Sequence, residues 1–187
     1  MKSIVKPLGL ALFAASMFAV NQAGATSMVR MGLEDLVRDN AVAVLGEVTG
    51  AQSYWNKEHS FILTDVTMQV TEAMKGVDAK SDGTISFTVM GGTVGELTNL
   101  IVAGPELALG GSYVLFLNKE DLPGAQQVLT TRDLSQAVFN VLPTKADGRL
   151  VAVSQASGVE LFPDQRGLTE AVGGEQGMEL EQLLNTV

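Results

Sequence analysis

Short stretches in which every second residue is apolar constrain the fold of this chain most. Within residues 61–74, Val66, Met68 and Val70 alternate with threonine and glutamine, and residues 84–90 show the same period. Successive side chains of a strand point to opposite faces of the sheet, so this pattern predicts strands with one buried face. Further strands are expected at residues 41–48, 97–102, 112–117, 127–131, 137–142, 150–153 and 159–162.

Turn signals and two helical stretches complete the predicted architecture. Asp147-Gly148 is a strong hairpin signal, whereas residues 52–60 and 91–95 are expected to form a polar loop and a glycine-rich loop. Apolar residues at helical spacing predict short helices at residues 28–40 and 178–187. The predicted fold class is therefore all-β with short N- and C-terminal helices, arranged as a small barrel or sandwich.

Residues 1–25 have the order of a secretory signal peptide. Lys2 and Lys6 precede an apolar run of 13 residues, and Ala23-Gly24-Ala25 fits an A-x-A cleavage site. The run is too short for a comfortable membrane span, so cleavage after Ala25 is expected, with an uncleaved anchor as the alternative. Residues 26–187 would then form a single exported domain, periplasmic or secreted, with no stable membrane insertion.

Charge and cysteine content exclude several functions. The chain has a net charge of −9, and removal of Lys2 and Lys6 leaves 10 basic and 21 acidic residues, a net charge of −11. Such a surface repels phosphate, so nucleic acid and anionic lipid are disfavoured as partners. The absence of cysteine excludes disulfides, thiolate catalysis and cysteine-ligated zinc, and no cofactor is expected.

The sequence contains no recognisable catalytic constellation. His59 is the single histidine, so a two-histidine metal site is excluded, and no G-x-S-x-G motif accompanies it. The carboxylates are spread singly along strand edges and turns, without a calcium-loop pattern. The chain is predicted to be non-catalytic, and a hydrolase or lyase that uses carboxylates and His59 is the catalytic alternative.

Two loops carry the residues predicted to contact a partner. Adjacent aromatic residues in the first loop could anchor a protein or carbohydrate, or one ring could cover an open end of the barrel. The glycine-rich loop lacks the lysine of a phosphate-binding loop and does not open a helix, so a strand-to-strand turn is favoured for it. The predicted partner-binding residues are Tyr54, Trp55, Gly91, Gly92, Thr93, Gly95 and Glu96.

Residues 40–117 resemble the netrin-like, OB-type barrel domains that include the tissue inhibitors of metalloproteinases. The similarity lies in the order of a first strand, a second strand ending at Lys75-Gly76, a strand at residues 85–89, the glycine-rich loop and a closing strand at residues 113–117. The same order of elements also resembles that of many small exported bacterial proteins, the group that this sequence resembles most. The resemblance implies a barrel, but no functional residue is carried over, because a mature end at Thr26 has no cysteine to present to a protease zinc.

Three functions are consistent with these observations. The first is an exported, non-catalytic binding module that recognises a protein or cell-envelope component through its loops. The second is an inhibitor of a secreted metalloprotease, and the third is the hydrolase or lyase described above. The terminal helix at residues 178–187 is expected to dock either onto the barrel or onto a second copy of the chain.

Overall fold

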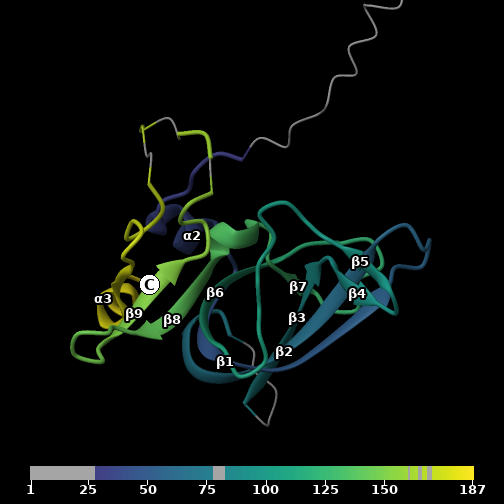
Figure 1. Cartoon of the computed structure of the whole chain (residues 1–187), viewed down its shortest axis with the longest axis horizontal. Helices are drawn as coiled ribbons and strands as arrows, with labels where there is room; N and C mark the ends of the chain where they lie inside the picture. Colours follow the sequence, from purple (N-terminus) through teal and green to yellow (C-terminus); the bar gives the residue numbers. More distant parts are fainter. Residues whose placement is uncertain (1–27, 78–82, 160, 164–165, 168–169) are drawn as a thin grey trace, which may run out of the picture.

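A computed structural model describes residues 28–77, 83–159, 161–163, 166–167 and 170–187. The expected signal peptide, its cleavage site and Thr26 lie outside these residues. The described chain is mostly β with two short helices (Figure 1). In chain order the elements are α2 (Leu33–Asp39), β1 (Val42–Trp55), β2 (Ile62–Lys75), β3 (Thr84–Met90), β4 (Gly92–Val94), β5 (Leu97–Asn99), β6 (Ser112–Lys119), β7 (Leu129–Thr130), the 3-10 turn η2 (Leu134–Ala137), β8 (Val138–Pro143), β9 (Leu150–Ser154), β10 (Met178–Glu179) and α3 (Leu180–Thr186).

Eight of the described strands form one partly closed sheet. Its order is β1-β2-β3-β7-β6-β8-β9-β10, and β1 also pairs with β6, so the sheet curls back onto its own first strand. The short strand β7 joins β3 to β6, and β4 and β5 form a separate hairpin. The prediction of an all-β fold with two short helices is confirmed. Where a barrel or sandwich was expected, the structure shows a partly closed sheet.

Burial on both faces explains the continuous apolar sequence of the central strands. In β1, Val42, Val44 and Val48 enter one apolar cluster, whereas Ala43 and Leu45 enter a second cluster on the opposite face. The residues of β6 alternate between the same two clusters. A strand covered on both faces needs apolar side chains at every position, whereas β2 shows the alternation of a half-buried strand over much of its length.

Both predicted helices form, and both pack on the second apolar cluster. Leu36 of α2 and Leu180 and Leu183 of α3 are buried there with aromatic residues of β6 and β8. In Figure 1 the two helices lie at the end of the molecule that holds β8 and β9, and the β4–β5 hairpin lies at the other end. The C-terminal helix therefore docks onto the sheet of its own chain, which is the first of the two arrangements expected from the sequence.

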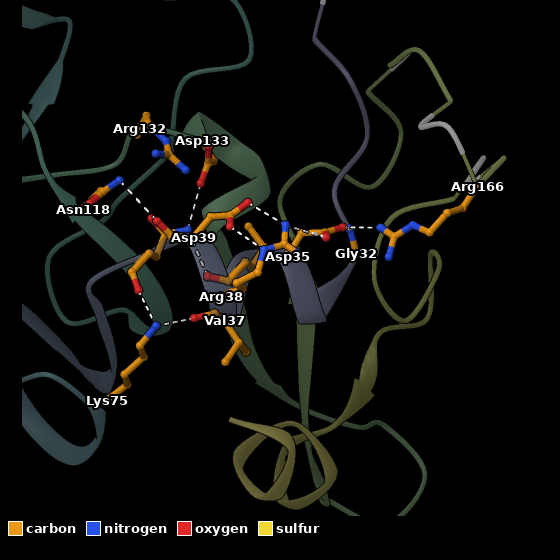
Figure 2. Close-up of polar contacts among 12 residues, drawn as sticks. Gly32, Asp35, Val37, Arg38, Asp39, Lys75, Asn118, Arg132, Asp133 and Arg166 are labelled. Atoms are coloured by element: carbon orange, nitrogen blue, oxygen red, sulfur yellow. Dashed lines mark hydrogen bonds and ion pairs between the residues drawn. The ribbon is translucent and has the colours of Figure 1, made fainter.

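A polar network fixes α2 to the sheet (Figure 2). Lys75, the last residue of β2, donates from Nζ to the carbonyl oxygens of Val37 and Asn40, the latter at 2.7 Å. The buried Asn40 side chain donates to the carbonyl oxygen of Leu36 at 3.1 Å and to Oδ2 of Asp133 at 2.8 Å. A cation at the carboxyl end of a helix satisfies carbonyl groups that have no partner within the helix.

The prediction of a loop at residues 52–60 is wrong for its first four residues. Residues 52–55 belong to β1, and only the part after Trp55 turns. The ladder with β2 continues through the pairs Ser53–Thr64 and Tyr54–Leu63, so pairing with a neighbouring strand overrides the polar local sequence. Register shifts occur next to Gly46 and at Gly50, which are typical of bulges that bend a long strand.

Other predicted boundaries also change. The glycine-rich stretch at residues 91–95 contains β4, and the strand expected at residues 97–102 ends at Asn99. Among the described residues of the strand expected at 159–162, Phe162 forms an isolated parallel bridge with Val29, and the helix expected from residue 28 begins only at Leu33. The strand at residues 84–90 and the hairpin across residues 147–148 are confirmed.

Candidate binding surface

Tyr54 lies at the end of β1 and belongs to a hydrogen-bonded group. Its hydroxyl donates to Oδ1 of Asp65 at 2.9 Å and accepts the backbone N–H of Gln126 at 3.1 Å. Partial burial raises the pKa of the Tyr54 phenol above its ordinary value, as does its hydrogen bond to the Asp65 carboxylate. Tyr54 thus holds the connection between β6 and β7 against the sheet.

Asp65 is the centre of this group, and sequence reasoning missed it. Besides the Tyr54 hydroxyl, Oδ1 accepts the Thr88 hydroxyl at 2.6 Å, and Oδ2 accepts Nε2 of Gln127 at 3.2 Å. The donors come from β1, β3 and the chain before β7, so only the folded topology brings them together. Because both carboxylate oxygens already accept hydrogen bonds, the arrangement fits a structural acceptor better than a general acid or base.

Trp55 and His59 lie on the two sides of the turn between β1 and β2. Their rings stack with centroids 6.1 Å apart and planes inclined by 19°. Asn56 builds the turn, since its Oδ1 accepts the backbone N–H groups of Ser60 at 2.8 Å and Phe61 at 3.2 Å. None of the ion pairs found among the described residues involves His59.

The two predicted aromatic anchors therefore have different surroundings. Tyr54 and Trp55 are successive residues of one strand, so their side chains leave it on opposite faces. Tyr54 is tied to Asp65, whereas Trp55 covers the β1–β2 turn together with His59. The structure does not bring the two rings together as one contact surface.

The glycines at residues 91–95 serve close packing and a tight turn. A Cβ on Gly92, which has φ of 131°, would lie 2.2 Å from Oγ1 of Thr64 and 2.5 Å from Oγ of Ser53. β4 therefore lies directly on β1 and β2, where only glycine fits. At the tip of the hairpin, Gly95 has φ of 61° with open space around it, and Glu96 is exposed.

The chain that follows this hairpin carries unusually exposed apolar side chains. We call residues 97–109 the apolar segment; it runs from β5 toward β6 (Figure 1). Leu97 and Leu109 are 61% and 68% exposed, and Leu100 and Val102 are 86% and 88% exposed. These last two are the most exposed large apolar side chains of the described residues. Isolated exposed apolar residues are common on protein surfaces, but a cluster of them along one segment indicates a contact site.

A groove of about 940 Å³ runs beside the apolar segment. Six residues between Ile101 and Ala108 and five between Val153 and Val159 line it, together with Tyr113, Ser135 and Asn140, whereas Leu100 and Val102 are not among the lining residues. Its volume is within the range of sites that hold ligands. The apolar run at residues 97–102 was the sequence signal for this region, but its strand-like composition did not indicate that its side chains would be exposed.

Gln155 holds the apolar segment at the groove. Its Oε1 accepts the backbone N–H of Glu106 at 2.8 Å, and its Nε2 donates to the carbonyl oxygen of Glu106 at 2.7 Å and to Oδ1 of Asn140 at 2.9 Å. Two backbone hydrogen bonds, from Ser135 to Ala103 and from Gly104 to Ile101, fix the other end. The segment is thus held in a defined conformation in which Leu97, Leu100, Val102 and Leu109 are exposed, whereas Leu107 packs against the first apolar cluster.

A second cluster, of charged side chains, surrounds α2, and its members form ion pairs with one another (Figure 2). The Asp35 carboxylate accepts the backbone N–H of Gly32 at 3.1 Å and forms ion pairs with Arg38 and Arg166. Although burial acts to raise the pKa of Asp35, these hydrogen bonds hold it below its ordinary value. A carboxylate kept ionised in this way fits a structural role, since a general acid needs a raised pKa.

The described residues contain neither a membrane-spanning helix nor a cluster of metal-ligating side chains. None of their helices has the length and apolar character needed to span a membrane. Their His, Asp and Glu side chains form no group of three or more that could hold a metal ion. No protein-family model, curated protein or solved structure matches this chain. Function is therefore inferred from the side chains and the groove.

Proposed function

We propose that the protein is an exported, non-catalytic binding module that recognises a protein or cell-envelope partner through the apolar segment. The observation that carries this proposal is the exposure of Leu100 and Val102, at 86% and 88% of their surface. Complete burial of a leucine or valine side chain against a partner contributes about 1.5–3 kcal/mol, so this pair offers substantial binding free energy.

Preorganisation supports the same proposal. The hydrogen bonds of Gln155 to Glu106 and of Ser135 to Ala103 order the segment before any partner arrives. A partner then loses less affinity to the ordering of a flexible loop. A segment ordered in advance and apolar on its outer side is well suited to recognition.

The non-catalytic part of the proposal rests on how the acidic groups are used. Asp65 and Asp35 accept several hydrogen bonds each, and His59 stacks on Trp55, so the hydrolase or lyase alternative has less support. The inhibitor alternative depends on Thr26, which lies outside the described residues; a secreted metalloprotease remains one of the partners that the proposal includes.

We also propose that the partly closed sheet is an OB-like, netrin-like barrel. The pairings β1–β2, β2–β3, β3–β7, β7–β6 and β6–β1 support this assignment because they return to the first strand. Barrels of this kind commonly present loops for binding. Export is supported by the charge, apolar run and small residues of residues 1–25.

The proposal is tested by capture of proteins from a cell-envelope extract on the immobilised protein. The test variant carries Leu100→Ser and Val102→Ser, and the matched control carries Leu142→Ser and Leu150→Ser, two leucines that are each 49% exposed on the β8–β9 hairpin. Both variants change exposed side chains and should keep their unfolding temperature. We expect the test variant to lose proteins that the control retains, and equal capture by both would contradict the proposal.

A further inference from the structure

We infer that the groove beside the apolar segment binds an extended peptide segment of a partner protein, one that combines apolar side chains with a lysine or arginine. The inference rests on the proposed function, because it names the kind of partner that would lie in the groove next to Leu100 and Val102. It is carried by the chemistry of the groove and by the distribution of charge around it.

The groove offers hydrogen-bond donors to a peptide backbone. The Tyr113 hydroxyl accepts the backbone N–H of Ala108 at 2.8 Å, and among the described residues no acceptor is found for its own proton. Asn140 uses Oδ1 to accept Gln155, and its amide N–H groups likewise have no acceptor within the described chain. Both residues line the groove, where the carbonyl groups of an extended segment could accept from them.

Charge on this side of the molecule is complementary to a cation. The sequence has no lysine or arginine between Gly83 and Asn118, and none of the residues that line the groove is basic. Glu106 lines the groove, is exposed, and is in no ion pair with another described residue. Asp35 and Asp147, in contrast, each pair with an arginine. A lysine or arginine of the partner would find the unpaired carboxylate of Glu106 at the groove.

Other occupants fit the groove less well. A sugar usually stacks on an exposed aromatic ring, but the ring that lines this groove, Tyr113, is only 5% exposed. Phosphate-containing partners and a second copy of this acidic chain are both repelled by its charge. An extended peptide with apolar side chains and one cationic residue complements the apolar wall at Ile101, the hydrogen-bond donors and the Glu106 carboxylate together.

The experiment selects short random peptides displayed on phage against the immobilised full chain and measures the enriched peptides by fluorescence anisotropy. Two variants test the groove: Glu106→Lys reverses its charge, and Ile101→Ser removes an apolar side chain from its wall. Two matched controls make the same changes elsewhere, Glu181→Lys on the exposed side of α3 and Leu142→Ser on β8. Glu106 contacts Gln155 through its backbone, so its charge reversal leaves that hydrogen bonding intact.

We expect enriched peptides to contain lysine or arginine among apolar residues and to bind Glu106→Lys about three- to tenfold more weakly, with a smaller difference at high salt. Ile101→Ser should also weaken binding, and both controls should bind as the original chain does. The inference is overturned if no peptide is enriched, if the enriched peptides lack cations, or if Glu181→Lys weakens binding as much as Glu106→Lys.

Two further outcomes separate this inference from binding to a membrane and from a failure of the proposed function. Binding of the chain to phosphatidylcholine vesicles that depends on Leu100 and Val102 would replace the peptide by a lipid surface and overturn the inference. Envelope capture that depends on Leu100 and Val102, with peptides indifferent to Glu106 and Ile101, would overturn the inference and leave the proposed function standing.

Discussion

Replacement of Gln155 by alanine tests whether one side chain holds the apolar segment in place. The change removes three hydrogen bonds, two to the backbone of Glu106 and one to Asn140. A hydrogen bond contributes about 0.5–1.5 kcal/mol net, and partly exposed bonds lie at the low end. The three bonds together then stabilise the ordered conformation of the apolar segment by about 1.5 kcal/mol. This free energy corresponds to about a tenfold change in the equilibrium constant for local opening of the segment.

Hydrogen exchange followed by mass spectrometry measures this opening directly. We expect peptides that cover residues 101–109 to exchange about tenfold faster in Gln155→Ala, because local opening limits their exchange. Gln155→Glu should also exchange faster, since it loses both donated hydrogen bonds but can still accept the N–H of Glu106. Exchange in the core strands β1 and β6 should not change, because Gln155 belongs to neither apolar cluster.

The matched control is Gln182→Ala, which changes an exposed glutamine on α3. It should leave exchange at residues 101–109 as it is in the original chain. Unchanged exchange of this segment in Gln155→Ala, or faster exchange throughout the protein, would refute the reasoning that Gln155 holds the segment locally.

Three further predictions concern stability and processing. Lys75→Met removes a cation that donates to two carbonyl oxygens at the end of α2, so urea unfolding should give a loss of about 1.5–3 kcal/mol; a loss no larger than that of Lys57→Met, at an exposed position in the β1–β2 turn, would contradict the capping role. Tyr54→Phe should lower the free energy of unfolding by about 1 kcal/mol near neutral pH. Because the folded pKa of Tyr54 is raised, its contribution is present below the ordinary tyrosine pKa and is lost as the pH rises through the folded value, so the difference between the two proteins should narrow above about pH 10; a constant difference would contradict this assignment. Mass spectrometry of the protein exported by a bacterial host should give an N-terminus at Thr26, and retention of residues 1–25 would contradict the signal peptide.

Local periodicity predicted those strands whose burial follows from their own sequence. The alternation of Ile85, Phe87 and Val89 predicted β3 with the bounds that the structure shows, because one face of that strand is buried along its length. The end of β1 was missed since Gln52 and Ser53 are polar, and they are held in a strand by pairing with β2 rather than by their own preference.

The candidate surface was harder to predict because it depends on contacts between distant residues. Residues 97–102, four of which are apolar, predicted a strand, and no local pattern indicates that no other element covers Leu100 and Val102. Gln155 and Glu106 are separated by 49 residues, and Asp65 collects donors from two other strands and a loop. The glycine-rich loop predicted at residues 91–95 contains β4 of the β4–β5 hairpin, and Gly92 serves the close packing of β4 on β1 and β2.

Site-specific photo-crosslinking in the exporting cell tests the central claim most directly. A benzophenone amino acid placed at Val102, at Trp55 or at Leu142 reports which surface contacts a partner. The apolar segment as binding surface predicts a crosslinked partner from position 102 and none from position 142. A partner crosslinked from position 55 or 142, with none from position 102, would contradict it.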